Sequence, residues 1–161
     1  MDKIKVLLYG DSPTAVTGNA KLVRGILSSL SNRDKYDLTM FALTANETEF
    51  ISLLSSSYIT NQRLIPSFPN LKNDYWGIER FKCLLQVEEF DVVITVNDVW
   101  RFHDFRKFLN SLPQRPQWIC YFPIDHAIRP AWVRFIQTID YPVVYSRYAL
   151  EELKRVGINR G

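Results

Sequence analysis

Near its N-terminus the chain reads Ile4-Lys5-Val6-Leu7-Leu8-Tyr9-Gly10. A compact apolar run that ends at a glycine is typical of a strand that is buried on both faces of a parallel sheet. The run Val92-Val93-Ile94-Thr95-Val96, within residues 91–96, has the same character and is rich in residues that favour strands. These two segments therefore predict central strands of one parallel sheet.

Between and beyond these strands, apolar residues recur at the spacing of one helix face. Helices are expected around residues 19–30, 78–88, 102–112, 130–139 and 149–156, and strands at 37–43, 58–65, 118–122 and 142–145. Residues 44–57 give only a hint of a short helix. The alternation predicts a single α/β domain over residues 1–161, a Rossmann-like three-layer α/β/α sandwich with a mainly parallel sheet.

Composition argues against several classes of protein. The net charge is +3, and no run of Lys and Arg approaches the basic stripe of a nucleic-acid binder. No apolar stretch reaches the ~20 residues of a membrane span, and no signal peptide is visible, so a cytoplasmic location is expected. The small basic excess is compatible with modest peripheral contact with an anionic membrane surface.

Aromatic residues and cysteines bear on where a site can lie. The chain has 4 Trp, 8 Tyr and 10 Phe, too many for the core alone, so some are expected to line a groove or an interface. Cys83 and Cys120 lack the spacing of a zinc or redox site, and we expect both to be small buried hydrophobic residues. No metal site is expected.

The side chains that are best suited to binding or catalysis lie in loops that follow predicted strands. Open parallel sheets bind ligands beyond the carboxyl ends of their strands, near the reversal of strand order. Loops 10–18, 97–100 and 123–126 should meet there, with residues 146–147 at the same edge. The candidate residues are Asp11, Ser12, Thr17, Gly18, Asn97, Asp98, Asp125, His126, Ser146 and Arg147.

Structural roles for these residues stay open beside the functional ones. Thr17 is of a type that caps helices, Asp11 can brace its own loop, and Gly18 can serve backbone geometry alone. Asn97 and Asp98 can simply start a helix, and Asp125 and His126 can be a surface pair. His103 is expected to be a solvated helix residue.

The first loop lacks the glycine fingerprint of dinucleotide binding and the lysine of a Walker motif, which disfavours an NAD enzyme or an ATPase. Backbone N–H groups near Thr17–Gly18, at the start of the first helix, are nevertheless suited to a phosphate.

Five pieces of the chain resemble the N-terminal domain of GT-B-fold retaining glycosyltransferases of family 4 (glycosyl transferases group 1). They are Lys5–Pro13 with Thr17–Gly18, Tyr75–Ile78, Asp91–Asp98, Tyr121–Asp125, and Val144–Arg147 with Glu152–Leu153. Such enzymes have two Rossmann-like domains that face a cleft, one for the acceptor and one for most of the nucleotide-sugar donor. The resemblance implies that residues 1–161 are the acceptor-side domain, that the donor-binding C-terminal domain is absent from this chain, and that the chain alone is not catalytic.

The resemblance also implies roles for particular residues. Thr17–Gly18 would lie near the donor diphosphate, and loop 123–126 beside the transferred sugar, with Asp125 and His126 as the catalytic candidates. The other eight candidates would bind substrate: a nucleotide sugar as co-substrate and a hydroxyl-bearing acceptor, with no further cofactor. Many relatives have Gly-Gly where this chain has Thr17-Gly18, and their histidine directly after the fifth strand is here displaced to Asp125 or His126.

Two alternatives come from other classes of protein. A flavodoxin-like module would use the hydroxyls of Ser12, Thr14 and Thr17 to bind the FMN phosphate, with Trp76 or Trp100 stacked on the flavin. Asp11 counts against it, because a carboxylate repels a nearby phosphate. The other alternative is a non-catalytic partner domain, which exposed aromatic side chains would support.

Overall fold

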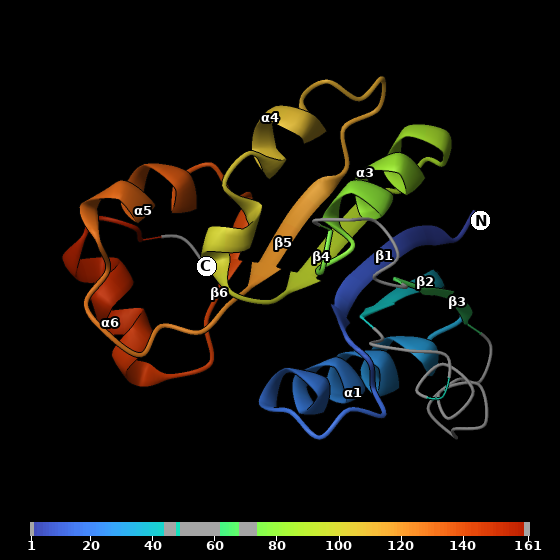
Figure 1. Ribbon diagram of the computed structural model, residues 1–161, viewed down its shortest axis with the longest axis horizontal. Helices are drawn as coiled ribbons and strands as arrows, with labels where there is room; N and C mark the ends of the chain where they lie inside the picture. Colours follow the sequence, from blue (N-terminus) through green and yellow to red (C-terminus); the bar gives the residue numbers. More distant parts are fainter. Residues whose placement is uncertain (1, 44–47, 49–61, 68–73, 160–161) are drawn as a thin grey trace.

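The computed structural model describes residues 2–43, 48, 62–67 and 74–159 (Figure 1). Within these residues one sheet is formed by β1 (Ile4–Asp11), β2 (Tyr36–Leu43), β3 (Arg63–Pro66), β4 (Val92–Val96), β5 (Gln117–Tyr121) and β6 (Tyr141–Val143). The strand order is β3-β2-β1-β4-β5-β6, and every neighbouring pair is parallel. This is the Rossmann order, which reverses direction between β1 and β4.

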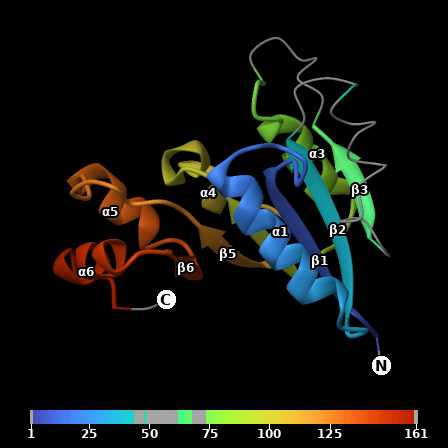
Figure 2. The same ribbon diagram turned by 90° about the horizontal axis from the view of Figure 1, so that it is seen from below.

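Helices cover both faces of the sheet. They are α1 (Gly18–Ser31), α3 (Ile78–Val87), α4 (Phe105–Leu109), α5 (Pro130–Ile136) and α6 (Arg147–Arg155), with a 3₁₀ turn η1 (Val99–Phe102). Figure 2 shows α1 on the opposite side of β1 and β2 from α3. The predicted three-layer α/β/α fold is therefore confirmed.

Alternation along β1 divides the core into two clusters. Val6 and Leu8 face α1 and pack in a mostly aliphatic cluster with Val23 and Leu27. The neighbouring side chains of β1 belong to the opposite cluster, which holds most of the buried aromatic residues: Tyr9, Phe41, Phe81, Phe90, Phe102, Phe105, Trp118 and Phe122. The buried residues of α3, α4, α5 and α6 all belong to this aromatic cluster.

Most predicted elements match the structure to within about three residues at their ends, and the helix expected at 130–139, for example, ends at Ile136. Two predicted elements differ by more. The helix expected at 102–112 is a 3₁₀ turn followed by the short α4, because the chain leaves helical geometry at Asp104 (φ −101°, ψ 2°). Aspartate competes with helix formation through its own side chain, and here it pairs with His103. His103 is solvent-exposed as expected, but it lies between the two helical turns.

The third strand is the other difference. The sequence predicted residues 58–65, whereas β3 begins at Arg63 and includes Pro66, which pairs with Ala42. Proline is tolerated there because β3 is the edge strand, with no further strand beyond it among the described residues. Residues 58–61, and all but one of residues 44–57, lie outside the described part of the chain.

The two cysteines have different environments. Cys120 on β5 is buried as predicted, and burial raises the pKa of its thiol to about 12. The prediction was wrong for Cys83, which is exposed on α3. Phe81 and Leu85 of that helix face the sheet, and a residue halfway between them points the other way.

Candidate functional site

The site lies where β1 and β4 end side by side, with Tyr9 paired to Thr95. The chain leaves β1 toward α1 on one face of the sheet and leaves β4 toward η1 on the other face. A crevice at such a reversal is the usual ligand site of open parallel sheets. The loops after β1, β4 and β5 therefore share one edge, as the sequence predicted.

The side chains of the loop after β1 are bonded to one another. Thr17 is the N-cap of α1: its hydroxyl accepts from Ala20 N at 3.0 Å and donates to Asp11 Oδ2 at 2.6 Å. Ser12 is buried, with its hydroxyl 2.8 Å from that of Thr14. Thr17 and Asp11 thus have the structural roles that the sequence left open: Thr17 caps α1, and Asp11 braces its own loop.

Gly18, the first residue of α1, lies beside open space. A Cβ built there would meet no described atom within 4 Å. Its φ lies outside the left-handed region, so the backbone geometry does not require a glycine at this position. Gly18 is exposed, so this side of the first helical turn is open to solvent, although Ala20 N already donates to Thr17.

The loop after β4 buries one of the candidate residues. Asn97 is 2% exposed, and its Oδ1 accepts from Asp98 N at 2.8 Å. Its Nδ2 has no hydrogen-bond partner among the described residues. A buried amide donor without a protein partner is uncommon in folded proteins, and an ordered water or a ligand oxygen is the usual partner for such a group.

Arg101 is a site residue that sequence reasoning missed. Its guanidinium carbon lies 3.1 Å from the ring centre of Trp76 and 4.5 Å from that of Trp100, and Nη2 is 3.4 Å from Asp98 Oδ2. Burial lowers the pKa of Arg101, while Asp98 opposes the shift. In the sequence, Arg101 stands out only because it follows Trp100. Its contact with Trp76, which is 25 positions earlier, is visible only in the tertiary structure.

The loop after β5 presents the catalytic candidates to solvent. His126 Nδ1 lies 2.6 Å from Asp125 Oδ1, and the imidazole packs edge-on against Trp132 with ring centres 5.4 Å apart. The Asp125 side chain is 88% exposed and that of His126 is 50% exposed. The hydrogen bond with His126 is the main reason why the pKa of Asp125 is lowered.

This loop is anchored from a distance. Ile124 and Ile128 are buried on either side of the pair, and Ile128 N donates to Glu152 Oε2 at 3.1 Å. Arg155 donates to both carboxylate oxygens of Glu152. The pair is thus exposed on a loop whose two ends are held. The sequence pointed to Glu152 only as part of a resemblance and did not indicate this role.

Ser146 and Arg147 have local partners. Ser146 is the N-cap of α6 and accepts from Ala149 N at 3.0 Å, and Arg147 pairs with Glu151 on the same helix at 3.3 Å. Their predicted substrate-binding role therefore has no support from these contacts.

Among the described residues, no group of three or more His, Cys, Asp or Glu could hold a metal ion. No helix in the described part of the chain is long and apolar enough to cross a membrane.

The fold and the site together define a Rossmann-like α/β domain whose candidate residues lie on the loops after β1, β4 and β5. No protein-family model and no curated protein matches the sequence. A similar solved structure is the apo form of the lipopolysaccharide outer core galactosyltransferase WaaB, with a TM-score of 0.58 and 15% identity. The match covers 97% of this chain and 43% of that one. At this identity the likeness shows a shared fold, and this chain spans less than half of the galactosyltransferase.

Proposed function

We propose that this chain is the acceptor-side half of a glycosyltransferase, which moves a sugar from a nucleotide-sugar donor to a hydroxyl acceptor. The observation that carries the proposal is the exposed Asp125–His126 pair, held at the carboxyl edge of the sheet. The likeness in fold to a galactosyltransferase supports it, as do the five sequence pieces that resemble retaining enzymes of family 4. In the proposed enzyme a donor-binding domain faces this domain across the site, and transfer requires both.

The geometry suggests how the pair acts. His126 Nδ1 is engaged by Asp125, which leaves Nε2 to bond a hydroxyl of the acceptor or of the transferred sugar. Transfer also needs stabilisation of the leaving diphosphate and close placement of the acceptor hydroxyl. The open start of α1 at Gly18 offers backbone N–H groups to the diphosphate, and Asn97 Nδ2 offers one further donor.

The test is sugar transfer by the complete gene product with labelled nucleotide sugars. The double substitution Asp125→Ala/His126→Ala should lower kcat/KM more than about tenfold, which corresponds to ~1.4 kcal/mol of transition-state stabilisation. The matched control is Arg63→Ala/Glu88→Ala, which removes another exposed pair at the opposite edge of the sheet and should leave transfer unchanged. A loss below tenfold in the first variant contradicts the assigned role.

The flavodoxin-like alternative loses its topological basis. Flavodoxin has the strand order 2-1-3-4-5, whereas this sheet has β1 between β2 and β4. Ser12 and Thr14, which would bind the phosphate, are bonded to each other. Flavin absorbance in the purified protein is the direct test of FMN binding.

A partner-domain role is favoured by one observation. Tyr141, Tyr145 and Tyr148 are each about half exposed near β6 and the start of α6. Aromatic residues at the surface are enriched at interfaces. Strictly monomeric behaviour in analytical ultracentrifugation counts against this second candidate.

A further inference from the structure

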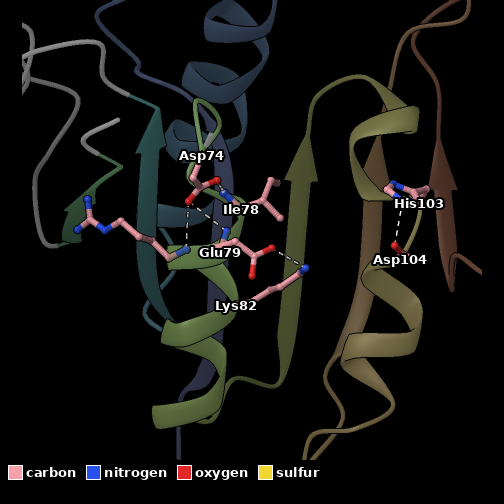
Figure 3. Close-up of polar contacts among 7 residues, drawn as sticks. Asp74, Ile78, Glu79, Lys82, His103 and Asp104 are labelled. Atoms are coloured by element: carbon pink, nitrogen blue, oxygen red, sulfur yellow. Dashed lines mark hydrogen bonds and ion pairs between the residues drawn. The ribbon is translucent and has the colours of Figure 1, made fainter. Parts of the chain in front are cut away.

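A cavity of about 300 Å³ lies at the carboxyl edge of the sheet, between the turn at residues 74–77 and the junction of η1 with α4. Figure 3 shows Glu79 and Lys82 on the α3 side, and His103 and Asp104 on the α4 side. Its volume is at the lower end of the range for small-ligand sites, which suits a ligand of one ring. Its lining includes Arg101 but none of the ten candidate residues that were chosen from the sequence.

The turn that forms one wall is fixed by several contacts. Gly77 has a φ of 60°, and a Cβ there would lie 2.8 Å from Ser67 Cβ. The Asp74 carboxylate accepts the N–H of Ile78 at 2.7 Å, and Tyr9 donates its hydroxyl to Trp76 O at 2.7 Å. Burial raises the pKa of Tyr9, so this donor keeps its proton. The turn is therefore a rigid support for the side chains it carries.

Two large aromatic residues on this turn face solvent. Tyr75 is 80% exposed and Trp76 is 42% exposed. The Arg101 guanidinium packs against the ring of Trp76, so the indole is held in place from inside the protein. Exposed aromatic rings beside a cavity are typical of binding sites, and they offer flat apolar surfaces for the C–H face of a ligand.

The polar groups around these rings are bonded in pairs. Lys82 bonds Glu79 at 2.8 Å, and His103 bonds Asp104 at 2.9 Å. The carboxylate side chains of Glu79 and Asp104 remain more than half exposed and can accept hydrogen bonds. The cavity has no excess of positive charge that would attract a phosphate, because the carboxylates of Asp74, Glu79 and Asp104 outnumber the two fixed cations, Lys82 and Arg101. Mixed donors and acceptors beside aromatic rings suit a neutral ligand with many hydroxyls.

We propose that this cavity is a sugar subsite, which holds a neutral pyranose unit of the acceptor against Tyr75 and Trp76. The acceptor role rests on the proposed function, but sugar binding itself does not require transfer. Glu79, Lys82 and Asp104 bond the ring hydroxyls, and the two aromatic rings contact the apolar face. The acceptor of this protein is thus a glycoside with an uncharged sugar at the bound position.

The test is an NMR titration of isotope-labelled protein with the methyl glycosides of glucose, galactose and mannose. At least one glycoside should bind with a dissociation constant in the millimolar range and shift the indole N–H signal of Trp76. Tyr75→Ala should weaken this binding about fivefold or more. Tyr75 is too exposed for its removal to unfold the protein, and an unchanged spectrum of the core amides verifies this. Tyr148→Ala, at another exposed tyrosine, should leave binding unchanged.

Three results would overturn the subsite. They are no shift of the Trp76 indole with any glycoside, equal affinity in the Tyr75→Ala variant, and the same shifts with inorganic phosphate, which would indicate an anion site. The transfer assay separates this inference from the proposed function. Glycoside binding that depends on Tyr75 in a protein without transfer activity supports the subsite and removes the proposed function. Transfer that survives without such binding removes only the subsite.

Discussion

The loop after β1 and the loop after β5 leave the same edge of the sheet, yet their polar side chains are used differently. In the first loop, Thr17 caps α1 and also bonds Asp11. In the second loop, α5 begins without a side-chain cap, and the anchor is Glu152, which is 24 positions away and accepts from Ile128. Asp125 and His126 consequently bond each other and stay exposed. When a distant residue stabilises a loop, the side chains of that loop remain available to a ligand.

The largest effect on stability is expected from a substitution that disrupts the packing beneath the first loop. Gly10→Ala places a Cβ 2.7 Å from Val23 Cγ2 and 3.3 Å from Val96 Cβ. Val23 is stiff and lies in a close-packed cluster, so the substitution should lower the free energy of unfolding by about 1–3 kcal/mol. Urea unfolding measures it, and a double-mutant cycle with Val23→Ala should show that the second substitution relieves part of the cost. Additive effects would show that Val23 is not the obstacle.

A smaller effect is expected from the cap of α1. Thr17→Ala removes the acceptor for Ala20 N and the donor to Asp11, and should cost about 1 kcal/mol of stability. Thr17→Ser keeps both bonds and is the matched control. Unfolding midpoints in urea compare the two variants. If the Thr17→Ala variant proves as stable as the Thr17→Ser variant, the assigned role of Thr17 in stabilising this loop is wrong.

The smallest effect on stability is expected in the second loop. Asp125→Ala and His126→Ala should each leave the urea midpoint unchanged, since both side chains are exposed and Ile128 keeps its bond to Glu152. A clear drop in midpoint for either variant would mean that the pair stabilises the loop, and would remove the contrast between the two regions.

The same pair allows a pH test. The hydrogen bond with His126 lowers the pKa of Asp125, so His126→Ala should raise that pKa toward the usual value of about 3.9. Because the folded-state pKa is lowered, the accompanying stabilisation, too small in this exposed pair to move the urea midpoint, is fully present above the usual value and is lost as pH falls through the lowered one. An NMR titration of the Asp125 carboxyl carbon in both proteins measures the change. Identical titrations would show that the pair does not form in solution.

Central strands could be predicted because burial on both faces leaves a continuous apolar run, as at Val6–Tyr9 and Val92–Val96. The position of the site loops could also be predicted, because the loops that follow parallel strands lie at the same edge of the sheet. The contact of Arg101 with Trp76 and the anchoring by Glu152 could not be predicted, because each joins residues from separate elements. The break at Asp104 was missed because Phe102 and Phe105 have helical spacing although the chain between them is not continuous helix.

The two strands that pair with β1, namely β2 and β4, lie at very different distances from it along the chain. Ile4 pairs with Tyr36, whereas Val6 pairs with Val92. The entropy lost in closing a loop grows with its length, so the β1–α1–β2 unit is expected to assemble well before β4 joins it. During synthesis, a nascent chain that ends before Val92 leaves one edge of β1 without a partner strand. Unpaired apolar edges of this kind promote aggregation, so this strand is where chaperone protection on the ribosome would matter most.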